Sequence, residues 1–166
     1  MKTLVTYYTR SGNTEKVAKA IYEELDEPKS LQKIKNDLKL EEFNLIFIGF
    51  PIENYWCPLD IHEFLKKNTE NAKIVFFITH GVPEDNELLP EWIDRAKQLL
   101  PTTAEVIDQF TCQSEVAQYV VDALKKSGQP MQMEWAAHCK NLIGLPDENK
   151  LQKAKSFAKR IQTQFS

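Results

Sequence analysis

A cluster of hydroxyl side chains around one glycine is the feature of this sequence best suited to chemistry. Hydroxyl groups donate hydrogen bonds to phosphate oxygens, and a glycine lets the backbone approach an anion closely and adopt positive φ. The pattern therefore predicts a phosphate-binding turn. The stretch consists of Thr9, Arg10, Ser11, Gly12, Asn13 and Thr14.

The turn lies between a predicted strand and a predicted helix. Residues 4–8 are an apolar run rich in β-branched and aromatic side chains, which favours a buried strand. After the turn, Val17, Ala20, Ile21 and Leu25 recur at helical spacing. The first N–H groups of such a helix lack intrahelical partners, and the positive end of the helix dipole lies beside them. Both features favour a bound phosphate.

Several kinds of phosphate site are excluded by what the turn lacks. No lysine follows Gly12, so the turn is not a P-loop, and a single glycine does not make a dinucleotide fingerprint. No cysteine precedes the turn, which excludes a phosphatase loop with a thiolate nucleophile. An alternative stays open, because hydroxyl groups also cap helices: the turn could join a strand to a helix without binding a ligand.

Strands and helices are predicted to alternate along the whole chain. The predicted strands are residues 4–8, 30–34, 43–50, 73–79 and 104–110. Helices are predicted after Gly12, from Pro58, and from caps at Asn86, Ser114 and Asp147. This order predicts an α/β fold with a mostly parallel five-stranded sheet covered on both faces, and residues 1–166 as a single domain. Residues 129–146 are irregular, and either a short strand or an insertion over the sheet edge fits them.

Two further loops are expected beside the turn, because a doubly wound sheet binds its ligand at the carboxyl ends of its strands. Residues 51–58 follow the third strand and contain an adjacent tyrosine and tryptophan, side chains that usually lie in cores or binding surfaces. Residues 79–86 follow the fourth strand. The candidate residues of these two loops are Pro51, Glu53, Asn54, Tyr55, Trp56, Thr79, His80, Gly81 and Val82.

The first turn resembles the phosphate loop of flavodoxins, written T/S-x-T/S-G-x-T, at every defined position. The resemblance implies a flavodoxin-like doubly wound sheet that binds FMN noncovalently. Residues 9–14 would hold its phosphate, mostly through neutral donors, and Arg10 would add a charge. Tyr55 or Trp56 would stack on the flavin ring, with Trp56 slightly preferred over Tyr55. The alternative for Trp56 is a core anchor that packs under the loop. Residues 79–82 would contact the polar edge of the ring.

The chain departs from many flavodoxins at two places. The loop after the fourth strand has no tyrosine for the second face of the flavin, and His80 is its nearest planar side chain. The loop after the third strand has no glycine, but Asn54 tolerates positive φ better than most residues. Cys57 is interpreted as a buried, inert thiol.

Charge and composition limit the partners. A net charge of −3 argues weakly against nucleic acid, and no apolar stretch is long enough to span a membrane. Three cysteines without metal-ligand spacing and a start without signal-peptide regions predict a cytoplasmic protein without a metal.

Three functions fit these observations. The first is an electron carrier that shuttles electrons between redox partner proteins through FMN, as a monomer or weak dimer, with no catalytic residues of its own. The second is an FMN-dependent NAD(P)H oxidoreductase that reduces a quinone or similar acceptor. The third is a binding module of the same fold that has lost FMN.

Overall fold

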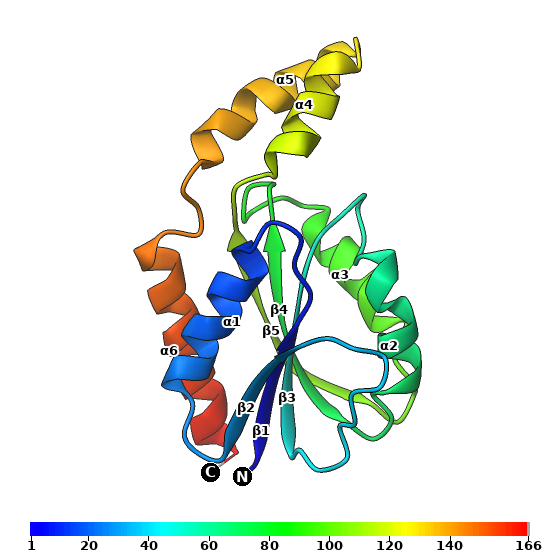
Figure 1. Cartoon of the computed structure of the whole chain (residues 1–166), viewed down its shortest axis with the longest axis vertical. Coiled ribbons are helices and arrows are strands. Elements are labelled where there is room, and N and C mark those ends of the chain that lie inside the picture. Colours follow the sequence, from blue (N-terminus) through cyan, green and yellow to red (C-terminus); the bar gives the residue numbers. More distant parts are fainter. Residues whose placement is uncertain (166) are drawn as a thin grey trace.

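The computed structural model describes residues 1–165, and a five-stranded parallel sheet lies at its centre (Figure 1). The strand order is β2-β1-β3-β4-β5, and every pair of neighbours is parallel. The predicted doubly wound five-stranded sheet is therefore confirmed. The strands are β1 (Thr3–Tyr7), β2 (Lys29–Lys33), β3 (Leu45–Pro51), β4 (Lys73–His80) and β5 (Glu105–Gln113).

Helices cover both faces of the sheet, as predicted. Figure 1 shows α1 (Asn13–Glu24) and α6 (Glu148–Gln164) on one face, and α2 (His62–Lys67) and α3 (Leu89–Lys97) on the other. A short 3₁₀ helix, η1 (Leu59–Ile61), leads into α2. The core accordingly forms two layers of buried apolar side chains, one on each face of the sheet. β3 and β4 contribute to both layers, which explains why their sequences are almost continuously apolar.

The helix caps match the sequence prediction at one position and differ at two. Asp147 caps α6 by accepting a hydrogen bond from the Lys150 amide at 3.0 Å. Asn86 accepts from the Leu88 amide at 3.0 Å, but this closes a turn ahead of α3 rather than capping the helix. Ser114 caps no helix, because β5 continues to Gln113 and the next helix begins only at Gln118.

Residues 117–142 form a helical hairpin beyond the carboxyl ends of the strands (Figure 1). It consists of α4 (Gln118–Lys126), α5 (Pro130–Cys139) and the 3₁₀ helix η2 (Lys140–Leu142). The interpretation of residues 129–146 as a strand was therefore wrong, and the segment is part of an insertion between β5 and α6 that is helical. Met131, Met133 and Trp135 alternate like a strand, yet Ala136 and Cys139 are buried against Val121 of α4, and that packing favours a helix.

The ends of β5 also differ from the prediction, because the strand extends three residues beyond 110. It contains Cys112, which was expected just after the strand. None of the helices of the described chain is both long and apolar enough to cross a membrane.

Candidate functional site

The loops after β1, β3 and β4 meet at the carboxyl edge of the sheet. β1 and β3 are neighbours at the place where the strand order reverses, which is where such sheets bind ligands. Backbone hydrogen bonds fix the bases of the loops: the Tyr8 amide donates to the Gly49 carbonyl at 2.9 Å, and the Ile52 amide donates to the Thr79 carbonyl at 2.8 Å. The structure thus brings together the three loops that the sequence indicated.

The turn after β1 presents an uncapped helix start. Gly12 is the N-cap residue of α1 and has φ of 91°, as predicted for this glycine, and no side chain of the described residues caps the helix. A Cβ atom on Gly12 would meet nothing within 4 Å, so the backbone is open to a ligand on that side. The first amides of α1 therefore lack both intrahelical and side-chain acceptors. The hydroxyl groups of the turn therefore do not cap α1, and the binding of a ligand at this turn stays a prediction.

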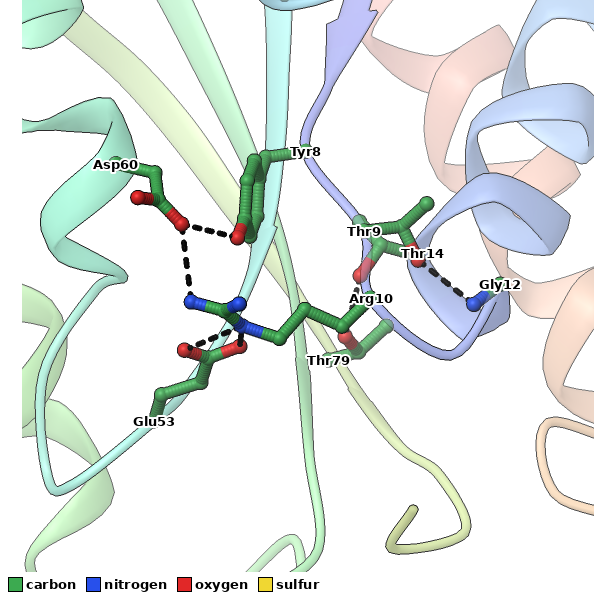
Figure 2. Close-up of polar contacts among 8 residues, drawn as sticks. All are labelled: Tyr8, Thr9, Arg10, Gly12, Thr14, Glu53, Asp60 and Thr79. Atoms are coloured by element: carbon green, nitrogen blue, oxygen red, sulfur yellow. Dashed lines mark hydrogen bonds and ion pairs between the residues drawn. The ribbon is translucent and has the colours of Figure 1, made fainter. Parts of the chain in front are cut away.

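The hydroxyl groups of the turn are held in different ways (Figure 2). Thr9 Oγ1 accepts a hydrogen bond from the Gly12 amide at 2.9 Å, so its own hydrogen stays available. Thr14 Oγ1 lies 2.8 Å from Thr79 Oγ1, and both side chains are buried. Because a hydroxyl both donates and accepts, this pair links the helix start to the end of β4 and leaves one hydrogen for a ligand. Ser11 is exposed.

Asn13 connects the turn to the base of the helical hairpin. Its side-chain amide donates to the Glu115 carbonyl at 3.0 Å. The backbone around Glu115 is joined in turn to the segment that follows η2, because the Glu115 amide donates to the Leu145 carbonyl at 3.0 Å. The hairpin base therefore lies beside the turn, a contact that no sequence pattern had indicated.

The loop after β3 makes a tight turn through two residues with positive φ. Glu53 and Trp56 pair through both backbone hydrogen bonds, at 2.8 and 3.0 Å, while Asn54 and Tyr55 have φ of 49° and 64°. Pro51 is the last residue of β3. The tolerance of Asn54 for positive φ, predicted from its residue type, is thus used in the structure.

The two aromatic side chains of this turn point to different surroundings. Trp56 is half-buried against the core, with its ring 4.5 Å from the ring of His62. Tyr55 is 66% exposed and lies 5.2 Å from the ring of Trp92 in α3. Trp56 therefore has the surroundings of a core anchor, and Tyr55 is the aromatic side chain with an accessible ring.

The loop after β4 contains a buried histidine and a closely approached glycine. His80 Nδ1 donates to the Val82 carbonyl at 2.8 Å, and burial lowers the pKa of His80, so its ring is neutral at pH 7. A Cβ atom on Gly81 would lie 2.6 Å from a methyl group of Val116 and 3.5 Å from the ring of Trp135. Glycine is therefore needed here because the hairpin base packs directly on the loop.

Arg10 crosses from the first turn to the second loop (Figure 2). Its Nε lies 2.9 and 3.1 Å from the two carboxylate oxygens of Glu53, and its Nη2 lies 2.9 Å from Asp60 Oδ2. The Tyr8 hydroxyl donates to the same Asp60 oxygen. Burial and this hydrogen bond raise the pKa of Tyr8 to about 12. Sequence analysis missed Tyr8 and Asp60, since no spacing signal joins residues about fifty positions apart.

Three buried polar atoms at this edge have no hydrogen-bond partner among residues 1–165. They are Asn13 Oδ1, Trp56 Nε1 and His80 Nε2, one beside each of the three loops. An unpaired buried polar atom costs about 1 to 3 kcal/mol, so three of them at the ends of neighbouring strands indicate a polar ligand. Three others, at Thr3, Thr6 and Gln109, lie within the strands and away from the loops. Two acceptors, one donor and the open amides of α1 fit a ligand with a phosphate and a polar ring, such as FMN.

The thiols take no part in this arrangement. Cys57, Cys112 and Cys139 are all free and buried. Burial raises the pKa of Cys57 and Cys112 to about 12, so neither is a thiolate near neutral pH. The predicted burial of Cys57 is confirmed, and its raised pKa agrees with an inert thiol. No cluster of three or more metal-ligating side chains occurs in the part of the chain that the structure describes.

The fold and this edge define a doubly wound α/β protein of the flavodoxin type. The family model for the flavodoxin domain matches residues 4–159, and the chain belongs to that family. A flavodoxin-like domain-containing protein of Clostridioides difficile, BilS, is 26% identical over 176 residues, which cover 100% of this chain and 99% of the relative.

Solved flavodoxin structures share the fold. Oxidised flavodoxin 2 from Bacillus cereus matches with a TM-score of 0.62 and 19% identity over 99% of both chains. A flavodoxin from the domain Archaea matches with a TM-score of 0.58 and 18% identity over 99% of this chain and 98% of its own. At these identities the likeness concerns the arrangement of strands and helices and leaves the ligand to be argued from the site.

Proposed function

We propose that the protein binds FMN at the carboxyl edge of the sheet and carries electrons between redox partner proteins. The observation that carries the proposal is the convergence of an uncapped helix start with three unpartnered buried polar atoms in the three loops. Membership of the flavodoxin domain family and a flavodoxin-like relative at 26% identity support the choice of FMN over other phosphorylated ligands.

The residues divide between the two ends of the cofactor. Thr9, Ser11, Thr14 and the first amides of α1 would hold the phosphate, because they combine hydroxyl donors with the positive end of a helix dipole. The loops after β3 and β4 would hold the ring, with Tyr55 as the accessible aromatic side chain. FMN supplies the electron-transfer chemistry when bound.

The chain itself contributes binding and surroundings rather than proton transfer. His80 is the histidine of the three loops, and its buried neutral ring has one nitrogen committed to the Val82 carbonyl. Its Nε2 keeps a lone pair and can accept a hydrogen bond without gaining a proton near neutral pH. A carrier needs no acid–base residue, so this arrangement agrees with electron transfer to a separate partner.

Titration of the purified protein with FMN, followed by flavin absorbance, tests the proposal. Thr14→Ala should weaken FMN binding by about 1 to 3 kcal/mol, because a charged phosphate loses one hydrogen bond at the helix start. Thr14→Ser keeps the hydroxyl and should retain most of the affinity. Riboflavin, which lacks the phosphate, should bind far more weakly than FMN.

The matched control is Thr163→Ala on α6, whose hydroxyl bonds only to its own helix, at the Lys159 carbonyl. Its FMN affinity should equal that of the original protein. A protein that takes up no FMN would overturn the proposal, and equal affinities for FMN and riboflavin would show that the phosphate is not held at this turn.

A second candidate, an FMN-dependent NAD(P)H oxidoreductase, is favoured by one observation. The hairpin base places Val116 and Trp135 against the loop after β4, where they add apolar walls beside the proposed ring site. Steady consumption of NAD(P)H by the isolated, FMN-loaded protein with a quinone acceptor would support this function. A carrier would consume NAD(P)H only when a separate reductase is added.

A further inference from the structure

Arg10 lies on the phosphate turn, but its guanidinium group is bonded elsewhere. Figure 2 shows its side chain extending from the turn toward Glu53 and Asp60, away from Gly12 at the start of α1. Glu53 belongs to the tight turn after β3, and Asp60 belongs to η1. The Arg10 side chain therefore joins the phosphate turn to the turn after β3. In the proposed function these two turns contact opposite ends of the same ligand.

The charges around Arg10 argue against a main role in binding phosphate. Both oxygens of Glu53 accept from Nε at 2.9 and 3.1 Å, and Asp60 accepts from Nη2 at 2.9 Å. Two carboxylates against one guanidinium leave the group with a net negative charge, which repels an anion. Tyr8 also donates to Asp60, and the guanidinium carbon of Arg10 lies 5.5 Å from the centre of the Tyr8 ring.

Besides the Trp56 ring on the core and the Tyr55 ring on Trp92, few contacts hold the turn that Arg10 reaches. Asn54 and Tyr55 are exposed, and both have positive φ, which residues other than glycine rarely adopt. Two backbone hydrogen bonds between Glu53 and Trp56 close the turn. The Glu53 side chain is only 26% exposed and is held by Arg10, so this contact fixes the first residue of the turn.

We propose that Arg10 is a positioning residue, a strap that holds the Glu53–Trp56 turn at the right place for the ring end of the flavin rather than a charge for the phosphate. The inference rests on the proposed function, since the ring end is meaningful only if a flavin binds. The strap acts on the loop, and it therefore affects every flavin, with or without a phosphate.

Two ligands and two variants separate the strap from a phosphate contact. Arg10→Gln and Glu53→Gln both remove the ion pair of the strap, but Glu53→Gln leaves the charge of Arg10 in place. We expect each variant to weaken FMN and riboflavin by the same factor, about threefold to tenfold, the range of an ion-pair network at a surface. Arg160→Gln is the matched control, because Arg160 joins α6 to Asp108 of β5 at the same 2.9 Å distance and far from the loops.

A phosphate role for Arg10 predicts a different pattern. Arg10→Gln would then weaken FMN alone, and Glu53→Gln would leave FMN binding unchanged or strengthen it by freeing the guanidinium group. Either result, or unchanged binding of both ligands in both variants, overturns the strap.

Hydrogen exchange in the protein without flavin gives an independent measurement. The amides of Glu53 and Trp56 should exchange several-fold faster in Arg10→Gln and Glu53→Gln than in Arg160→Gln. If the original protein binds no flavin, the proposed function fails, and this exchange measurement still decides whether Arg10 holds the turn. Equal exchange rates in all three variants would show that it does not.

Discussion

His80 has a buried imidazole ring with only one of its nitrogens bonded. Its Nδ1 donates to the Val82 carbonyl, and Nε2 has no partner within the described chain. Burial favours the neutral ring and lowers the pKa of His80 from its usual 6.5. In the unfolded chain the same side chain is solvated and takes up a proton at its ordinary pKa.

The lowered pKa of His80 makes the stability of the fold depend on pH. Below about pH 6.5 the unfolded state binds a proton more readily than the folded state. The contribution of His80 to the free energy of unfolding is therefore complete above that pH and is lost as the pH falls toward the pKa of the folded state. His80→Asn keeps a donor for Val82 but does not titrate. We expect the difference in the free energy of unfolding, original protein minus variant, to decrease as the pH is lowered from about 8 to about 5. A constant difference, measured by urea unfolding, would contradict the assignment.

Gly49 is a second residue whose surroundings allow a prediction, in this case about packing in the core. It lies in β3, and a Cβ atom on it would overlap the ring of Phe77 in β4. Gly49→Ala should therefore lower the free energy of unfolding by about 1 to 3 kcal/mol or more, because the added methyl group overpacks the core against the Phe77 ring. Phe77→Leu removes ring atoms at the point of overlap. The double variant should lose less than the sum of the two single losses, and simple additivity would show that the ring is not the cause.

At the scale of elements, the strand, turn and helix from residue 3 to 24 follow closely from the sequence. Local rules suffice there, since the apolar run, Gly12 and the helical spacing of Val17 and Ile21 all act within a few residues. The prediction of a strand in residues 129–146 was wrong for the opposite reason. The alternation of Met131, Met133 and Trp135 is a weak local signal, and the packing of Ala136 on Val121 overrides it.

The same distinction applies to the elements that form the site. Which loops meet could be predicted, because the strand order of a doubly wound sheet decides it. How their side chains bond could not be predicted. The bonds from Arg10 to Glu53 and Asp60 span 43 and 50 residues, and those from Asn13 to Glu115 span 102. Contacts of this kind depend on the finished arrangement of the loops, which no spacing in the sequence encodes.

At the scale of the whole molecule, the chain has two parts with different amounts of core. The sheet and its four covering helices enclose two extensive layers of buried apolar side chains. The hairpin of α4 and α5 is held by a small third cluster of three buried residues, Val121, Ala136 and Cys139. It joins the remainder of the chain through its base, at Glu115, Gly81 and the segment around Leu145.

This difference predicts two levels of stability in one chain. A segment with few buried contacts opens locally without unfolding the remainder, so the amides of α4 and α5 should exchange with solvent faster than those of β3 and β4. Val121→Ala removes two methyl groups from the small cluster and should speed exchange in the hairpin by an amount corresponding to about 1 to 2 kcal/mol.

Exchange in β3 and β4 should stay unchanged in Val121→Ala, because global unfolding governs those amides and the hairpin contributes little to it. Val75→Ala, in the layer shared by β4 and α1, is the contrasting variant and should speed exchange in the strands. If Val121→Ala instead accelerated exchange throughout the sheet, the hairpin would be part of the global folding unit. The open edge of the sheet would then depend on the hairpin for its stability as well as for the contacts of Asn13 and Gly81.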